Sequence, residues 1–549
     1  MFLDRWVAAI LPPLAFWILF NGFDDLILNI LWLWTWLFGK SLELPDDHAP
    51  ERPIAIFVPL WREHRVIRHM VEHNIASQKF TSFHFFIGAY PNDAPTLAAL
   101  SDLDAHYPQV HIAQCPHPGP TSKADCLNWI YQRMLLYEEE HDIRFETVMT
   151  HDAEDLIHPE ALRLIDRYTR VYGMVQIPVL ALPTSWRELT HGVYCDEFAQ
   201  FQFRDMPVRN RVGGFVPSNG VGTGFSREAI EALAAAHNNR IFEPSCLTED
   251  YENGYRVHRL GFRQLFIPLM KIDGSFAATR EYFPRSYRAA VRQRTRWTTG
   301  IALQSWEYHG MRETLSQLWW FWRDRKTVVN NLLTPVIQLL TLYGGITFAA
   351  SASTHREWAL AGIFPPAVNW SLALIGALHV AIRAGTSARV YGWSFAATTP
   401  LRMVWGNWIN FIASASALRR YAISRATGRP LVWLKTEHSY PNRNSLLEHE
   451  LVASPDEDSV SVAVTRSLPA ALSRRWQVLP FRISAGHLHL AGVAAPTDEM
   501  HVELAGLCSL EIRFHKISET DYKSLSEKYL PEESTALAEE PASIVAPSL

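Results

Sequence analysis

The sequence predicts an α/β protein built on a wound, mostly parallel sheet, together with transmembrane and interfacial helices and a small C-terminal α+β domain. Three observations predict this architecture. Strand-like and helix-like segments alternate between residues 50 and 320, other stretches are apolar enough to cross a bilayer, and the composition turns polar and mixed after residue 440. A chain of 549 residues is also too long for one ordinary core.

The expected division of the chain follows from these shifts in composition. We expect, in order, a membrane anchor with an interfacial helix at 1–45, an α/β domain at 50–320, two transmembrane helices at 325–385, interfacial helices and a closing segment at 386–440, a compact domain at 445–530, and a disordered tail at 531–549.

The overall composition excludes some classes of partner. The net charge of -5 provides no global basic field, so a nucleic-acid partner is not expected. The 20 Trp and 28 Phe in a chain that is only 19% charged are typical of a protein at a membrane interface. The five cysteines show no paired close spacing, which predicts neither a zinc site nor a disulfide framework and suits a reducing cytoplasm.

The N-terminal apolar stretch runs from Trp6 to Phe23 and stops at Asp24 and Asp25. It lacks a small-residue cleavage site, so we expect an anchor rather than a removable signal peptide. The shorter, Trp-rich run from Leu26 to Phe38 is expected to lie in the membrane interface, with a tight helical hairpin as the alternative.

Two later stretches, Thr327–Ala350 and Trp358–Ile382, are long and uncharged enough to span a bilayer. Basic residues flank both outer ends of this pair, which puts those ends in the cytoplasm. The following stretch, Met403–Ala417, is interrupted by two asparagines and reads as an interfacial amphipathic helix. Buried core helices are the alternative for all these segments.

Three strand-like runs precede polar motifs in the α/β region. They are Ile54–Val58, which Pro59 ends, then Phe83–Ile87 and Thr147–Thr150. Helix-like stretches separate them, so a parallel wound sheet follows. Ligands of such sheets bind beyond the carboxyl ends of the strands, and the polar motifs fall there.

The third strand is followed by an acidic group, Asp152, Glu154 and Asp155. Hard oxygen ligands of this kind suit Mg²⁺ or Mn²⁺, which would bridge to substrate phosphates and offset charge on a departing diphosphate. An acidic helix cap is the alternative.

Three further motifs can carry chemistry. In the segment Thr248–Asp250, a carboxylate facing the site could take a proton from an acceptor hydroxyl, with a helix cap as the alternative. Gln293, Arg296 and Trp297 recur at helical spacing and can share one face of a helix. The arginine side chain fits phosphate oxygens, and the indole ring can stack on a sugar. Binding of anionic lipid headgroups is the alternative for this motif. The glycines of Asn219–Gly224 let backbone approach a ligand, but the Rossmann and Walker patterns are missing.

In this order, the motifs between residues 52 and 440 resemble the processive-type glycosyltransferase family 2, which has the GT-A fold. The resemblance is carried by Val58–Glu63, Asn92-Asp93, Lys123–Asn128, Asp152–Asp155, Gly222–Gly224, Thr248–Asp250, Gln293–Trp297 and Trp433–His438.

The resemblance implies a role for each motif. It implies donor binding by Pro59, Glu63, Asp93, Lys123 and Asp152, metal binding by Asp152 with Glu154 or Asp155, catalysis by Asp250 as base with Glu249 beside it, and acceptor and diphosphate binding by Gly222, Thr223, Gly224, Gln293, Arg296 and Trp297. The family's usual Asp-x-Asp metal motif reads Asp152-x-Glu154 here, so the second ligand stays open.

Within that family the chain is similar to bacterial membrane enzymes of the phage-adsorption protein B type. Those join the transferase to a domain similar to the amino-terminal domain of type II secretion ATPases, and Leu472–Leu530 fits that domain. In relatives this domain can bind cyclic di-GMP, but the expected Arg-Leu-Gly repeat is not evident in residues 443–470. Protein docking or a spacer role is the alternative.

The resemblance therefore implies an inverting, multi-pass glycosyltransferase of the bacterial inner membrane with cytoplasmic catalytic and C-terminal domains. Its expected partners are a UDP-sugar, a growing surface or secreted glycan acceptor, lipid and an outer-membrane export protein. The alternative is a catalytically silent membrane scaffold. The intact set of Asp152, Asp250, Gln293, Arg296 and Trp297 argues against that alternative.

Overall fold

The computed structural model describes residues 2–38, 42, 49–272, 274–310, 313–431, 460, 462–465, 468–484, 487–494, 497, 500, 503 and 511–530. The chain divides into two compact units, Met1–Tyr440 and Pro441–Leu549. The expected closing segment Trp433–His438 and the expected disordered tail lie outside the described residues.

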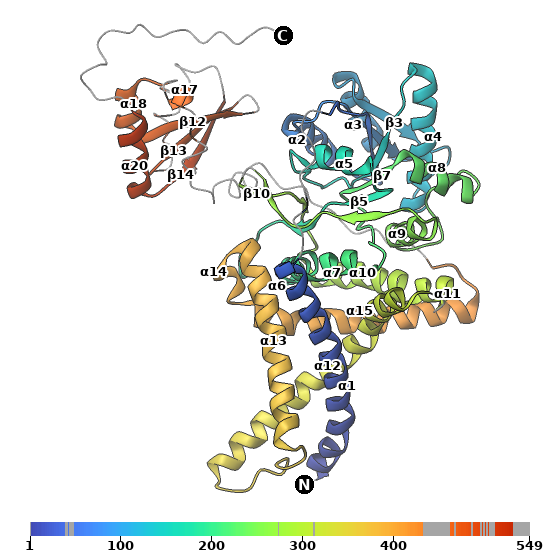
Figure 1. Ribbon diagram of the computed structural model, residues 1–549, viewed down its shortest axis with the longest axis vertical. Coiled ribbons are helices and arrows are strands. Elements are labelled where there is room, and N and C mark those ends of the chain that lie inside the picture. The colour runs from blue at the N-terminus through green and yellow to red at the C-terminus, as the bar shows by residue number, and fades with distance from the viewer. Residues whose placement is uncertain are drawn as a thin grey trace. The chain divides into compact units, whose positions relative to one another are not determined.

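A seven-stranded sheet organises the first unit, with the strand order β3-β2-β1-β4-β7-β5-β8 (Figure 1). Strand β1 pairs in parallel with β2 and β4, whereas β7 runs antiparallel to β4 and β5. The strands are β1 (Ile54–Pro59), β2 (Phe83–Ala89), β3 (Val110–Gln114), β4 (Thr147–Thr150), β5 (Met174–Gln176), β7 (Thr223–Ser226) and β8 (Gln264–Phe266). The expected wound, mostly parallel sheet is confirmed.

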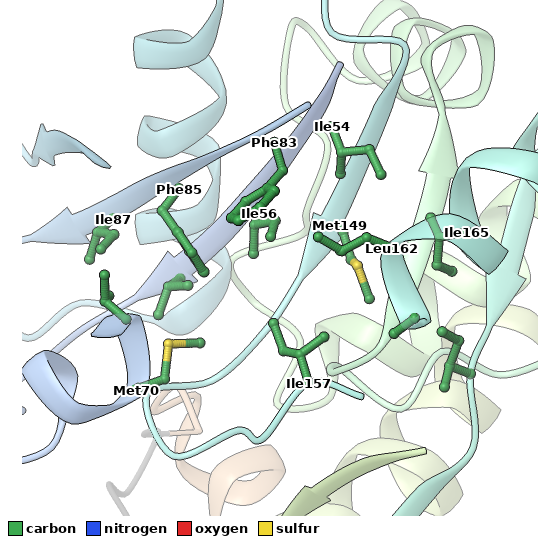
Figure 2. Close-up of a cluster of buried hydrophobic side chains, with 14 of the residues drawn as sticks. Ile54, Ile56, Met70, Phe83, Phe85, Ile87, Met149, Ile157, Leu162 and Ile165 are labelled. Atoms are coloured by element: carbon green, nitrogen blue, oxygen red, sulfur yellow. The ribbon is translucent and has the colours of Figure 1, made fainter. Parts of the chain in front are cut away.

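Helices cover both faces of this sheet because its central strands are apolar on both sides. On β1, Ile54, Ile56 and Val58 face one core, whereas Ala55 and Phe57 face the other. Figure 2 shows the first core, where Met70, Phe85 and Leu162 pack against β1 and β4. That face is covered by α2 (Ile67–Ser77), α3 (Ala94–His106) and α5 (Ala161–Thr169), and the opposite face by α4 (Lys123–His141), α8 (Arg227–Ala236) and α9 (Glu249–Arg259).

A second group of helices lies between the sheet and the apolar helices. Its members are α6 (Leu189–Gln200), the π-helix η1 (Phe201–Asp205), α7 (Met206–Arg211), α10 (Tyr287–Trp297), the π-helix η2 (Thr298–Gln304), α11 (Ser305–His309), α14 (Trp393–Ala396) and α15 (Thr399–Thr427). Four short strands also form two small sheets. In one, β6 (Val179–Ala181) pairs with β11 (Thr279–Glu281), and in the other β9 (Lys271–Ile272) pairs with β10 (Ser275–Phe276). In Figure 1, α15 runs crosswise to the apolar helices.

Among the described residues, three helices are long and apolar enough to cross a membrane: α1 (Phe2–Phe38), α12 (Leu315–Ser353) and α13 (Pro366–Tyr391). They lie side by side in Figure 1. The side chains of α1 bond to α12 in opposite chain order, with Asp4 accepting from Tyr343 and Trp17 donating to Asn330, so the two helices are antiparallel.

The expected break of the first helix at Asp24 and Asp25 is wrong, because α1 continues through both residues to Phe38. The carboxylates are neutralised within the structure instead. Asp24 Oδ2 lies 2.5 Å from both Arg323 Nη1 and Lys326 Nζ of α12, and Asp25 pairs with Arg323 at 2.9 Å. A charged pair inside an apolar helix therefore ties α1 to α12 and does not end the helix.

The second unit is a small α+β domain, as expected. Its sheet has the order β12-β13-β14, with β12 antiparallel and β14 parallel to β13. The strands are β12 (Val478–Ser484), β13 (His487–Gly492) and β14 (Glu511–Lys516), and the helices are α17 (Val462–Thr465), α18 (Ala470–Arg475) and α20 (Glu519–Tyr529). Leu479, Phe481, Tyr522 and Leu525 form the core between β12 and α20.

We expect Asp24→Asn to destabilise the protein by about 3 kcal/mol, because it leaves Arg323 and Lys326 buried without their shared carboxylate. Thermal melting of the purified protein in detergent would measure this. Glu307→Gln is the control, because it breaks the exposed pair with Arg425, which should be worth less than about 1 kcal/mol. Equal melting temperatures for the two variants would contradict the assigned role of Asp24.

Candidate active site

Polar residues gather at the carboxyl edge of the sheet, where β1, β2 and β4 end. Asp93 follows β2, and its Oδ2 accepts the backbone N–H of Arg62, 2.5 Å away in the loop after Pro59. Asp152 follows β4, and its Oδ1 lies 2.5 Å from Nζ of Lys123, the first residue of α4. Parallel pairing thus brings together three motifs that are far apart in the sequence.

Glu63 lies in the same loop as Arg62. Its backbone N–H donates to Thr96 Oγ1 at 3.2 Å, and its carbonyl accepts from Val66 and Ile67 at the start of α2. Both Glu63 and Asp93 are buried. These contacts fix the β1–α2 loop against the start of α3, next to the edge where a donor would bind.

Lys123 is the cation that holds the carboxylates of the site together. Burial alone would lower the pKa of Lys123, but Asp152, Glu249 and Asp250 raise it above its ordinary value. The lysine therefore stays charged in the folded protein. Asp250 and Glu249 come from the start of α9, a helix that begins far from α4 in the sequence. The predicted Asp152, Lys123 and Asp250 thus form one electrostatic cluster.

Asp250 is half-buried on the first turn of α9, and its Oδ1 accepts the Tyr251 backbone N–H at 2.8 Å. Burial raises the pKa of Asp250, while Lys123 and Arg296 oppose that rise. Gly220 makes room for the carboxylate, because a Cβ there would lie 2.6 Å from Asp250 Oδ2. Gly220 also has φ +80°, which a side chain rarely adopts.

The glycine motif lies differently from the expected acceptor loop. Thr223 and Gly224 are buried in β7, where Thr223 Oγ1 donates to Gln176 Oε1 at 2.7 Å. Gly224 pairs with both β4 and β5 and packs on Ile165, and Gly222 packs on Thr279. The close approach to the site falls at Gly220, two residues before the expected segment, because strand pairing removes Thr223 and Gly224 from the surface.

Glu249 and Glu281 add two further carboxyl groups. Burial and the neighbouring Asp250 raise the pKa of Glu249 to about 7. Burial also raises the pKa of Glu281 well above its usual range, with Asp155 and Asp152 acting in the same direction. Sequence reasoning missed Glu281, because it lies on the three-residue strand β11, which has no apolar run to mark it.

The turn that carries Asp152 is joined directly to β11. Leu156 and Arg280 exchange two backbone hydrogen bonds of 2.8 and 3.0 Å. This bridge brings Glu281, next in the chain to Arg280, to the side of the acidic turn. The pairing of β11 with this turn and with β6 is what shows that Glu281 lies beside the acidic turn.

Helix α10 supplies the arginine of the site. Gln293 Oε1 and Arg296 Nε are buried without a hydrogen-bond partner among the described residues. A buried polar atom without a hydrogen-bond partner costs free energy, and such atoms are typical of sites that bind a ligand. Trp297 lies against Tyr194, Phe198 and Phe283, so its ring also fixes the end of α10.

The π-helix η2 connects α10 to the loop that enters α9. Gln304 Oε1 accepts the Leu247 backbone N–H at 3.0 Å, and Gln304 Nε2 donates to the Ser245 carbonyl at 3.1 Å. A Cβ on Gly300 would lie 2.2 Å from Thr248 Oγ1, so this glycine permits the close packing. The π-helix that follows α10 therefore packs on the loop that enters α9 and helps to position Asp250.

The structure tests which residues fit a divalent metal. The described residues contain no group of three His, Cys, Asp or Glu side chains arranged to hold a metal. Asp152 offers a half-exposed hard oxygen, which fits Mg²⁺ or Mn²⁺ if the donor diphosphate and water complete the coordination. Glu154 is buried beside it.

Asp155 fits that metal role poorly. Its Oδ2 bonds to His151 Nδ1 at 2.6 Å and accepts the Asp152 N–H at 2.9 Å. Burial raises the pKa of Asp155 well above its usual range and lowers that of His151 to about 3. The pair braces the turn, and we assign no ligand role to Asp155.

A wound α/β sheet whose carboxyl edge gathers a lysine, an arginine and several carboxylates is the arrangement expected of a group-transfer enzyme. Residues 50–300 match the family described as "Glycosyltransferase like family 2", and residues 447–536 match the MshEN domain. The chain therefore carries a family 2 glycosyltransferase domain, which confirms the expected GT-A class, and a C-terminal MshEN domain.

Two relatives extend the likeness beyond the transferase domain. The chain is 32% identical over 454 residues to Bacteriophage adsorption protein B of Escherichia coli strain K12 and to Bacteriophage N4 adsorption protein B of E. coli O157:H7. The match covers 77% of this chain and 60% of each relative, so the chain spans 60% of their length.

One solved structure shares a weaker likeness. The mannosyltransferase PcManGT from Pyrobaculum calidifontis, in complex with GDP-Man and Mn²⁺, aligns with 73% of this chain and 99% of its own. The identity is 15% and the TM-score 0.45, which is too weak to carry a conclusion about ligands.

The raised pKa of Glu249 predicts a pH dependence of stability. A carboxyl whose pKa rises from 4.5 to about 7 on folding stabilises the native state below about pH 4.5, and this contribution is lost as the pH rises through about 7. Glu249→Gln mimics the protonated form, so its melting temperature should fall less than that of the wild type between about pH 5.5 and about pH 8. The same fall in both proteins would show that Glu249 titrates normally.

Proposed function

We propose that this chain is an inverting membrane glycosyltransferase that moves a sugar from a UDP-sugar to a growing surface or secreted glycan. The proposal is carried by the convergence of Lys123, Asp152, Asp250 and Arg296 on one edge of the sheet. Two cations and a carboxylate base are what a negatively charged donor and a hydroxyl acceptor require.

Asp250 is the proposed base of a single displacement. The acceptor hydroxyl gives its proton to the Asp250 carboxylate, its oxygen bonds to the anomeric carbon of the donor sugar, and the bond from that carbon to the UDP oxygen breaks. Attack opposite the departing UDP inverts the anomeric centre. The burial that raises the pKa of Asp250 makes its carboxylate a stronger base.

The donor diphosphate is the proposed ligand of Lys123 and Arg296. Both side chains carry their charge before the donor binds, so they would stabilise the negative charge of departing UDP without reorganisation. Mg²⁺ or Mn²⁺ bound by Asp152, with Glu154 nearby, would supply further neutralisation of that charge. Glu63 and Asp93, in the loops beyond β1 and β2, are the proposed neighbours of the uridine.

The membrane supplies the proposed setting of the reaction. We place the protein in a bacterial inner membrane with the transferase domain on the cytoplasmic side, and three described helices long and apolar enough to cross a bilayer support the membrane placement. An outer-membrane export partner stays a prediction. So does cyclic di-GMP binding by the MshEN domain, because most of residues 443–470, where the repeat was expected, lie outside the described residues.

The proposal predicts metal-dependent UDP release by the purified full-length protein with one member of a UDP-sugar panel. Asp250→Asn should lower that rate at least about 100-fold, because it removes the base and keeps the shape of the side chain. A coupled assay of UDP release, with and without Mg²⁺ or Mn²⁺ and with membrane extract as acceptor, measures both effects.

The matched control is Asp104→Asn, the same chemical change at an exposed position of α3. It should leave the rate unchanged. Absence of release with every sugar and metal, in protein that melts cooperatively, would favour the silent scaffold. Equal rates in Asp250→Asn and wild type would remove Asp250 from the mechanism.

A further inference from the structure

A cavity of about 310 Å³ lies beside the proposed active site, between α10 and the last turns of α15. Five arginines line it: Arg292 and Arg296 from α10, Arg419 and Arg420 from α15, and Arg429 from the segment that follows α15. Arg292 and Arg296 are one helical turn apart and so share a face of α10. Arg419, Arg420 and Arg429 lie beyond residue 300, where the family match ends.

The charge of Arg296 acts on Asp250 and Glu249, whereas the other four arginines have no carboxylate partner in the described part of the chain. The ion pairs found there include none formed by Arg292, Arg296, Arg419, Arg420 or Arg429. No Asp or Glu is among the described residues that line the cavity either. By contrast, Arg294 of the same helix and Arg425 of α15 pair with Glu197 and Glu307. Arginines gathered around a cavity without a described carboxylate create a positive potential there, which favours an anionic ligand.

The geometry favours phosphate over a carboxylate ligand. Guanidinium forks match phosphate oxygens, and arginines from two helices and a loop can surround a group that has several oxygens. The rest of the wall is partly apolar, with Leu247, Ile423, Pro430 and Leu431, so the ligand also has a less polar portion. Leu247 is three residues before Asp250, so the cavity adjoins the proposed base.

We propose that this arginine cavity binds a phosphate or diphosphate group of an amphiphilic or nucleotide ligand. Two sources share that chemistry. One is a nucleoside diphosphate next to the donor site, and the other is the phosphate of a lipid. The lipid source is physically accessible because α15 exposes Leu401, Val404 and Ile423, apolar side chains that fit a membrane surface. The proposal concerns binding and does not rest on sugar transfer.

Calorimetric titration of the full-length protein in neutral detergent with inorganic pyrophosphate tests the site. The double variant Arg419→Gln/Arg420→Gln should bind pyrophosphate at least about tenfold more weakly than the wild type, because it loses two charge-assisted contacts. Both side chains are exposed, so the fold should persist, and the melting temperature checks this. Arg425→Gln is the matched control, because it removes the same charge from the same helix outside the cavity.

Competition then separates the two sources. Displacement of pyrophosphate by UDP identifies a nucleoside diphosphate, and displacement by dioctanoyl phosphatidic acid but not by UDP identifies a lipid phosphate. The proposal is overturned if the double variant binds pyrophosphate as the wild type does, if Arg425→Gln weakens binding equally, or if neither competitor displaces it. None of these outcomes depends on UDP release, so a failure here leaves the proposed transferase untouched.

Discussion

The charge on Lys123 is the constraint on which the candidate active site depends. Asp152, Glu249 and Asp250 come from two distant segments, and burial makes it costly to ionise Glu249 and Asp250 together. A lysine at the start of α4, 2.5 Å from Asp152, is the cation that opposes this cost, because its charge acts to lower the pKa of both Glu249 and Asp250. Burial still raises the pKa of Asp250, and together with the neighbouring Asp250 it raises the pKa of Glu249 to about 7. The pKa values of these carboxyl groups therefore reflect burial opposed by the charge of Lys123, with Arg296 acting in the same direction.

Two consecutive acidic residues of α6 connect this site to the apolar helices. Asp196 accepts from Ser387 of α13 and from Arg402 of α15, at 2.6 Å and 2.7 Å. Glu197 pairs with Arg294 of α10 at 2.7 Å, and that arginine also donates to Asn410 of α15. Removing one partner of a buried pair costs about 3–5 kcal/mol, so these contacts hold α10 rigidly against α13 and α15. The arginine helix of the transferase is thus fixed relative to the helices that would cross the membrane.

The sequence was most informative where a property repeats. The parallel sheet, the apolar helices and the order of the polar motifs follow from periodicity and from strand ends, and Asp152, Lys123 and Asp250 do converge. The features that the sequence did not predict depend on contacts between distant segments. The continuity of α1 through Asp24 depends on Arg323 and Lys326, almost 300 residues later. Glu281 enters the site only through the bridge from Arg280 to Leu156, which no local pattern records.

Helix α10 contributes to both proposed sites. Arg296 acts electrostatically on Asp250 and Glu249 and also lines the arginine cavity, to which Arg292, Arg419 and Arg420 add positive charge. The carboxylates offset the charge of Arg296, whereas Arg292, Arg419 and Arg420 form no ion pair with the described residues. A diphosphate released beside Asp250 would therefore be drawn along α10 toward the arginines. An anionic lipid headgroup would instead approach the same arginines from the apolar face of α15. In either case, the uneven placement of carboxylates around α10 would favour an anion in the arginine cavity.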